Sequence, residues 1–133
     1  MRNMLKRYSQ DTYDKLAMIL EEGRLKNLEV PILVEGRRDE RTLRLLGFKG
    51  EIVILNQGKS LSDVADEISS SYEEIILLLD WDRKGNMLEE RMEILLANLG
   101  VHCDLSLRRN LQAILGTHLT SVEELSVFAD LIF

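Results

Sequence analysis

Hydrophobic and polar residues alternate along the chain with two different periods, which predicts four strands separated by helices. Short runs rich in apolar and β-branched residues predict strands at Val30–Val34, Glu51–Leu55, Ile75–Leu79 and Val101–Leu107. Apolar residues spaced three or four apart predict helices at Ser9–Asn27, Asp39–Leu46, Leu61–Tyr72, Met87–Leu99 and Leu111–Leu115. Thr120 and Glu123 are spaced as a capping box, so a last helix is expected from there to Leu131.

Apolar strands that alternate with helices indicate an α/β fold, in which a mainly parallel sheet is sandwiched by helices. The fourth strand alternates apolar and polar residues, which favours a position near an edge of the sheet. We expect residues 1–29 to form an N-terminal helical extension and residues 30–115 the α/β domain. Residues 116–133 are expected to form a C-terminal helix packed on the same domain. Ligands of such sheets bind beyond the carboxyl ends of the strands.

Composition limits the class of protein further. The chain has 133 residues, of which 45% are hydrophobic and 30% charged, as in a globular protein with one core. Its single cysteine, Cys103, excludes an internal disulfide and a Cys-rich zinc site, so a reducing, cytoplasmic location is expected. The longest apolar run, Ile75–Leu79, is too short to span a bilayer, and no signal-peptide core follows the first charges.

Acidic residues follow two of the predicted strands. Glu35 follows the first strand, and Asp80 and Asp82 follow the third. If that strand continues through both aspartates, their side chains project to one side, about 6.6 Å apart. Glu35 would lie about 4.8 Å from the third strand if the two strands pair. Carboxylates so crowded repel one another unless protons or a cation intervene, and their hard oxygens suit Mg²⁺.

Basic residues are expected on the same rim as these acids. They follow all four predicted strands, and they are Arg37, Arg38, Lys59, Arg83, Lys84, Arg108 and Arg109. The net charge of −6 argues weakly against a protein that coats nucleic acid. A carboxylate cluster ringed by cations nevertheless suits a polyphosphate or a nucleic-acid backbone. The alternative is that these cations merely solvate loops, which are usually polar.

The two acidic motifs resemble those of the Toprim domain, which topoisomerases, bacterial primases, OLD-type nucleases, RecR-type repair proteins and ribosomal-RNA maturation nucleases share. The likeness consists of a strand followed by Glu35-Gly36-Arg37-Arg38-Asp39, then a β-α unit, then a strand followed by Asp80-Trp81-Asp82-Arg83-Lys84-Gly85. It covers about Val30–Leu115 and is strongest to small stand-alone Toprim proteins of archaea and bacteria. The resemblance implies a Toprim, Rossmann-like fold with four strands.

The resemblance also implies roles for individual residues. Glu35 would be the catalytic acid or base and a ligand of a first Mg²⁺, Asp80 would bridge two metals, and Asp82 would hold the second. Asp39 would support the second metal, although it also stands where a helix N-cap belongs. One or two Mg²⁺ ions, which Mn²⁺ can replace, would then support phosphodiester cleavage or transfer on RNA or DNA.

Other functions fit parts of this pattern. A Toprim scaffold that holds nucleic acid or a protein partner without turnover is the main alternative. A phosphatase of the haloacid dehalogenase type also uses an Asp-x-Asp pair, but there the pair follows the first strand, whereas Asp80 and Asp82 follow the third. Gly58-Lys59-Ser60 is not a phosphate-binding loop, because the position of the earlier glycine is occupied by Val53.

Overall fold

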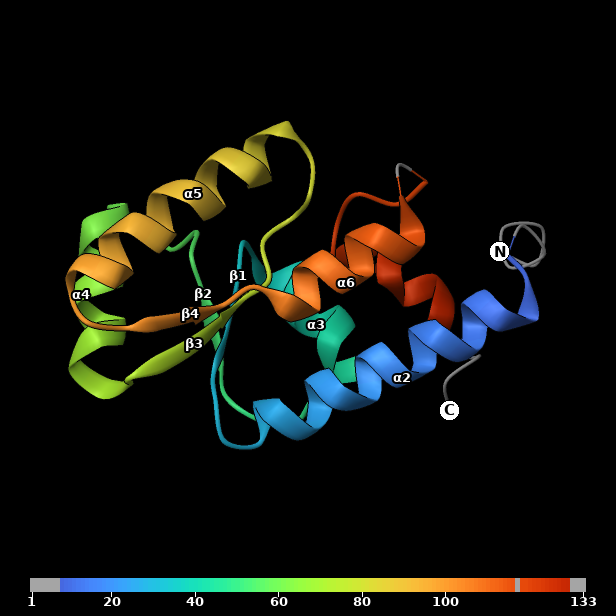
Figure 1. Cartoon of the computed structure of the whole chain (residues 1–133). Helices are drawn as coiled ribbons and strands as arrows, with labels where there is room; N and C mark the ends of the chain where they lie inside the picture. Colours follow the sequence, from blue (N-terminus) through green and yellow to red (C-terminus); the bar gives the residue numbers. More distant parts are fainter. Residues whose placement is uncertain (1–7, 117, 130–133) are drawn as a thin grey trace.

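The computed structural model describes residues 8–116 and 118–129, within which a four-stranded sheet lies between two layers of helices (Figure 1). The strands are β1 (Ile32–Val34), β2 (Ile52–Ile54), β3 (Glu74–Leu77) and β4 (His102–Asp104). The helices are α2 (Gln10–Asn27), α3 (Arg37–Leu45), α4 (Leu61–Ser71), α5 (Arg83–Asn98), α6 (Ser106–Leu115) and the 3-10 helix η1 (Glu123–Phe128). Strands and helices therefore alternate as the hydrophobic pattern predicts.

All four strands are parallel, and their order across the sheet is β2-β1-β3-β4. The parallel α/β fold and the edge position of β4 are therefore confirmed. In the centre, Leu33 of β1 lies opposite Leu77 of β3. The carboxyl ends of the strands meet at one edge of the sheet, which we call the carboxyl edge. Because β1 and β3 are neighbours, the residues that follow them come together there.

Each face of the sheet has its own hydrophobic core. On one face, α2, α3, α6 and the segment 119–128 pack on alternate residues of the strands, including Ile32 and Ile76. On the other face, α4 and α5 pack on the intervening residues, such as Leu33 and Leu77. Burial of both faces explains why β1 and β3 are apolar without alternation. The fold holds the carboxyl edge between these two helical layers.

Two element boundaries differ from the predicted ones because of local side-chain bonds. β4 has three residues, and α6 already begins at Ser106, so the end of the predicted strand Val101–Leu107 is helical. Asp104 Oδ1 accepts bonds from the N–H and the hydroxyl of Ser106, which turns the chain out of the strand. Helix α5 begins at Arg83 rather than Met87 because Asp82 caps it, its Oδ1 accepting the N–H of Gly85 at 2.7 Å.

The first part of the predicted C-terminal helix is a 3-10 helix rather than an α-helix. It is the short helix η1, and residues 130 and 131 of the prediction lie outside the described residues. Thr120 and Glu123 do not form the expected capping box, because the N-cap of η1 is Val122 and no side chain caps this helix. Ser121 Oγ accepts the N–H of Glu124, and the Glu124 side chain lies 2.9 Å from that hydroxyl. The Thr120 carbonyl instead accepts the backbone N–H of Trp81, which fastens this segment beside the carboxyl edge.

Candidate metal centre

Glu35 and Asp80 lie next to each other at the carboxyl edge. Glu35 directly follows β1 and is 8% exposed, whereas Asp80 follows β3 and is partly exposed. Beyond the assigned strands, the pairing continues as Leu78 N–H donates to the Leu33 carbonyl at 2.9 Å. The N–H of Asp80 then donates to Glu35 Oε1 at 3.3 Å. The parallel register of β1 and β3 thus sets the two carboxylates side by side.

Asp82 belongs to the same cluster but reaches it differently from the sequence-based expectation. The strand does not continue through it, because β3 ends at Leu77 and Asp82 is the N-cap of α5. Placement of Asp80 and Asp82 on one side of a continuous strand is therefore wrong. The Asp82 side chain is exposed, and its charge raises the pKa values of both Glu35 and Asp80. Asp82 thus forms the solvent-facing side of the cluster.

Asp39 is a buried member of the group. It is the third residue of α3, whose N-cap is Gly36, so the expectation of Asp39 as the N-cap is wrong by three positions. Asp39 Oδ2 accepts the N–H of Gly36 at 3.0 Å, and the carboxylate also accepts the N–H of Glu123. These bonds fix the turn that carries Glu35 into α3. Asp39 therefore orients the loop and adds negative charge beside Glu35 and Asp80.

Burial makes the cluster costly to ionise. Loss of solvent raises the pKa of Asp80 to about 7, which the bond from the Val122 N–H partly opposes and the charges of Glu35, Asp39 and Asp82 reinforce. Burial likewise raises the pKa of Glu35, although the Asp80 N–H and the Lys84 ammonium act in the opposite direction. The Asp80 carboxyl is therefore partly protonated near neutral pH unless a cation compensates its charge.

The carboxylates fit a magnesium ion in their chemistry and in their free oxygens. Glu35, Asp80 and Asp82 each use one oxygen to accept a backbone N–H, and the other oxygen has no hydrogen-bond partner in the described part of the chain. Among residues 8–116 and 118–129, no three acidic, histidine or cysteine side chains surround one ion position. Mg²⁺ commonly takes one or two carboxylates and completes its shell with water and substrate phosphate. The arrangement therefore suits an open Mg²⁺ site, in which two of these carboxylates bind the ion and water and substrate phosphate complete its shell.

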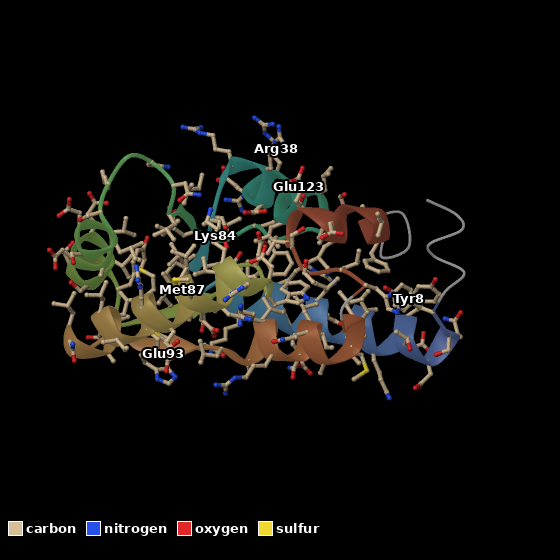
Figure 2. The ribbon with its side chains drawn as sticks, turned by 90° about the horizontal axis from the view of Figure 1, so that it is seen from above. Tyr8, Arg38, Lys84, Met87, Glu93 and Glu123 are labelled. Atoms are coloured by element: carbon tan, nitrogen blue, oxygen red, sulfur yellow. The ribbon has the colours of Figure 1, made fainter. Side chains whose placement is uncertain are left out.

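Several of the predicted cations are exposed near the cluster. Arg37 and Arg38 begin α3, and Arg83 and Lys84 begin α5. Figure 2 shows Arg38 and Glu123 close together, consistent with their 3.8 Å ion pair, and Lys84 at the start of α5. The N-termini of both helices open at the carboxyl edge, and their N–H groups favour anions. This side of the molecule therefore combines carboxylates with groups that attract phosphate.

Two other predicted cations are exposed but are not placed beside the acids. The Lys59 ammonium lies 2.5 Å from Glu67 on α4, and Arg109 lies on the surface of α6.

Arg108 is not on the rim, which corrects the prediction for this residue. The residue is 3% exposed, and its guanidinium donates to the carbonyls of Leu79 and Asp80 at 2.9 and 2.7 Å. It also donates to Asn86 Oδ1 and forms an ion pair with Glu89 at 2.6 Å, both on α5. A guanidinium with so many fixed partners cannot also bind phosphate. Arg108 instead joins α6 and α5 to the segment that carries Asp80.

The segment 119–122 contacts the cluster, and no pattern in the sequence indicated this contact. Trp81 is buried, and its Nε1 donates to the Leu119 carbonyl at 2.6 Å. Asp80, the residue before Trp81, accepts the N–H of Val122 through Oδ1 at 2.9 Å. The lone tryptophan between two aspartates indicated packing, but nothing in the pattern identified its partner. The C-terminal segment thus sets the orientation of the Asp80 carboxylate.

Gly85 permits α5 to begin against the Asp80 backbone. A Cβ on Gly85 would lie 1.8 Å from the Asp80 carbonyl oxygen, so any side chain must push the helix and the Asp80 segment apart. Gly36 differs, because a Cβ there would meet nothing within 4 Å and its φ of −146° is open to any residue. The glycine of the second motif is therefore required by packing.

We expect Gly85→Ala to lower the free energy of unfolding by about 2 kcal/mol, because the added methyl overlaps fixed backbone. Urea denaturation measures this loss. Gly36→Ala is the matched control and should change stability by less than about 0.5 kcal/mol. Equal effects of the two substitutions would contradict the close approach of α5 to Asp80.

Comparison with known proteins agrees with this geometry. Residues 30–106 match the Toprim domain family. The match covers more than half of the chain and includes both acidic motifs, so the chain belongs to the Toprim family.

Among similar proteins, a UPF0292 protein of Thermoplasma volcanium is 48% identical over 84 residues, which are 63% of this chain and 71% of that protein. A UPF0292 protein of Pyrococcus furiosus is 39% identical over 115 residues, which cover 86% and 84% of the two chains. A solved structure of a protein from Aquifex aeolicus shares the fold with a TM-score of 0.71 and 29% identity, covering 80% of this chain and 94% of that one. The expected resemblance to small Toprim proteins is therefore confirmed.

None of the helices in the described part of the chain has the length and apolar character that a membrane span requires.

Proposed function

We propose that this protein binds Mg²⁺ at Glu35, Asp80 and Asp82 and cleaves or transfers phosphodiesters of nucleic acid. Family membership supports a metal-dependent role connected with nucleic acid. The observation that carries the proposal is the adjacency of Glu35 and Asp80 at the carboxyl edge, with Asp82 at the exposed N-cap of α5, each with an oxygen that no backbone N–H occupies. Exposed cations and two helix N-termini beside them supply attraction for a phosphate backbone.

The proposed role of each residue follows from its surroundings. Asp80 and Glu35 would hold one ion through their free oxygens, and Asp82, which is exposed, would hold a second ion or a metal-bound water. Mg²⁺, when bound, polarises a phosphoryl oxygen and stabilises the leaving oxygen. Glu35 would be the acid or base, because it lies beside Asp80 at the carboxyl edge and burial raises its pKa above the ordinary value. Arg83 and Lys84 would hold the substrate phosphates.

The direct test is cleavage by the purified full chain. Structured RNA, single-stranded DNA and duplex DNA are offered with Mg²⁺, with Mn²⁺ and with EDTA. The proposal requires cleavage of at least one substrate that depends on the metal and that Glu35→Gln abolishes.

A binding module without turnover is the second candidate, and it is favoured by the lack of three converging ligands among the described residues. That reading is correct if no substrate is cut and Glu35→Gln binds nucleic acid as well as the wild type.

The exposed cations at the start of α5 predict a specific salt dependence. Replacing Arg83 and Lys84 together by Ala should weaken nucleic-acid binding and reduce the slope of log K against log salt by about 2, since each contact releases about one counterion. Fluorescence anisotropy in EDTA measures both effects without cleavage. Lys49→Ala, in the exposed loop before β2, should leave the slope unchanged. If the double substitution leaves the salt slope as unchanged as Lys49→Ala does, the nucleic acid does not contact Arg83 and Lys84.

A further inference from the structure

Arg108 is a buried cation that lies between α5 and the segment that follows β3. The residue is 3% exposed and belongs to the first turn of α6. Its Nε donates to the Leu79 carbonyl at 2.9 Å, and Nη2 donates to the Asp80 carbonyl at 2.7 Å. On the side of α5, Nη2 donates to Asn86 Oδ1 and Nη1 to Glu89 Oε2, both at 2.6 Å. One guanidinium therefore bonds both the backbone after β3 and the side chains of α5.

Both of these segments carry proposed metal ligands. Asp80 itself accepts one of the bonds through its backbone carbonyl. Asn86 lies in the first turn of α5, and its N–H donates to the carbonyl of Asp82, the N-cap, at 2.9 Å. The guanidinium thus joins the backbone of Asp80 to the turn of helix that begins at Asp82. The separation of these two carboxylates depends on that joint.

The other contacts of Asp80 leave its backbone little freedom to turn. Its N–H donates to Glu35 Oε1, and its Oδ1 accepts the N–H of Val122. Its carbonyl, which Arg108 holds, also lies where a Cβ on Gly85 would overlap it at 1.8 Å. Loss of the guanidinium frees this carbonyl, so the peptide can rotate and carry the carboxylate away from its position beside Glu35.

An arginine suits this place for its geometry more than for its charge. An apolar side chain of similar volume often stabilises a fold as well as a buried ion pair does, so stability alone does not explain a cation here. A guanidinium adds direction, because its coplanar N–H groups reach several acceptors at fixed angles. Lysine offers its donors from one atom, so it cannot keep the Leu79 and Asp80 carbonyls and the Glu89 carboxylate bonded together.

We propose that Arg108 is a positioning residue for the metal site and that it holds the Asp80 backbone at a fixed separation from the helix that Asp82 caps. This role rests on the proposed function, because it concerns the affinity of the site for its metal. The guanidinium has its partners within the protein, so it acts on the site through the Asp80 carbonyl and through Asn86.

Two substitutions separate this role from general stabilisation. Arg108→Lys keeps a positive charge beside Glu89 but loses the fork, and it should raise the dissociation constant for Mn²⁺ by about 10-fold. Asn86→Ala removes one bond to the guanidinium at an exposed helix position, where alanine favours the helix. It should fold as well as the wild type and still raise the dissociation constant by about 3-fold. Asn98→Ala, at the exposed end of α5, is the matched control and should leave the affinity unchanged. Electron paramagnetic resonance of free Mn²⁺ measures these affinities on the full chain.

The position of Asp80 can also be measured without a metal. The Val122 N–H donates to Asp80 Oδ1, whereas the Leu125 N–H donates to the Val122 carbonyl. In EDTA, Arg108→Lys should speed hydrogen exchange of the Val122 N–H by about 10-fold relative to that of the Leu125 N–H. A loss of overall stability alone would accelerate both amides together.

The outcomes distinguish this role from the proposed function. If the wild type does not bind Mn²⁺, the proposed function and the role of Arg108 are both wrong. If the wild type binds Mn²⁺ but Arg108→Lys or Asn86→Ala binds it as tightly as Asn98→Ala does, only the role of Arg108 is wrong. The same conclusion follows if the Val122 and Leu125 amides keep their relative exchange rates in Arg108→Lys.

Discussion

Asp80→Asn should remove the stabilisation that Mg²⁺ gives to the folded protein and should stabilise the metal-free protein. The amide retains an oxygen that can accept the Val122 N–H, so the fold is preserved. It lacks the charge that burial penalises and that a cation would neutralise. At a Mg²⁺ concentration of 100 times the dissociation constant, wild-type protein gains about 3 kcal/mol, and the variant should gain close to none. Thermal unfolding in Mg²⁺ and in EDTA measures the stability of the metal-bound and of the metal-free protein.

The sign of the pH dependence follows from the raised pKa of Asp80. Because the folded value is about 7 and the ordinary value is 3.8, the folded chain binds more protons than the unfolded chain between these limits. The stability of the metal-free protein therefore falls as the pH rises through this window. At pH 8, Asp80→Asn should raise it by about 2 kcal/mol, a figure reduced for the remaining solvent contact of the side chain.

Protons and Mg²⁺ compete for the same carboxyl groups, so the increase in melting temperature caused by Mg²⁺ should be small at pH 5.5 and full at pH 8. Asp66→Asn, an exposed change on α4, is the control and should leave the Mg²⁺ response as in the wild type. If Asp80→Asn retains the full Mg²⁺ response, the ion binds elsewhere.

Glu35→Gln should lower the rate of phosphodiester cleavage by about 1,000-fold while leaving the fold intact. The amide cannot take up or release a proton, and acid or base catalysis contributes about 100- to 10,000-fold in enzymes. Its oxygen can still accept the Asp80 N–H, so the β1–β3 contact persists. Initial rates on the best substrate, measured with saturating Mn²⁺, provide the comparison.

Two further observations separate catalysis from binding in this variant. Glu73→Gln, an exposed change in the turn before β3, should leave the rate within about twofold of the wild type. Nucleic-acid affinity of Glu35→Gln in EDTA should match that of the wild type, because the cations are untouched. A loss of affinity equal to the loss of rate would show that Glu35 supports substrate binding rather than the chemical step.

Those parts of the fold that depend on hydrophobic period could be predicted from the sequence. The runs around Leu33 and Leu77 are apolar because both faces of β1 and β3 are covered, and that pattern indicated central parallel strands. The adjacency of Glu35 and Asp80 then follows from the order of the strands, because residues that follow neighbouring parallel strands share an edge. The expectation for this pair depended on nothing beyond strand pairing.

Long-range side-chain contacts could not be predicted in the same way. Arg108 follows β4 in the sequence and looked like another exposed cation, but its guanidinium enters the interior to satisfy the carbonyls of Leu79 and Asp80. The bond from Val122 to Asp80 joins residues 42 positions apart, and no local periodicity encodes it. The expected positions of the Asp80 and Asp82 side chains depended on a strand that continues through both residues, whereas Asp82 is the N-cap of α5. In each case a specific hydrogen bond prevailed over the local pattern.

The central claim is that a divalent cation binds between Glu35 and Asp80 at the carboxyl edge. Anomalous diffraction from crystals grown with Mn²⁺ and an oligonucleotide tests it most directly, because Mn²⁺ scatters strongly and occupies the same oxygen sites as Mg²⁺. We expect an anomalous peak within coordination distance of both side chains, and we expect crystals of Asp80→Asn to lack it. A fully occupied Mn²⁺ site at other residues, with none between Glu35 and Asp80, would contradict it.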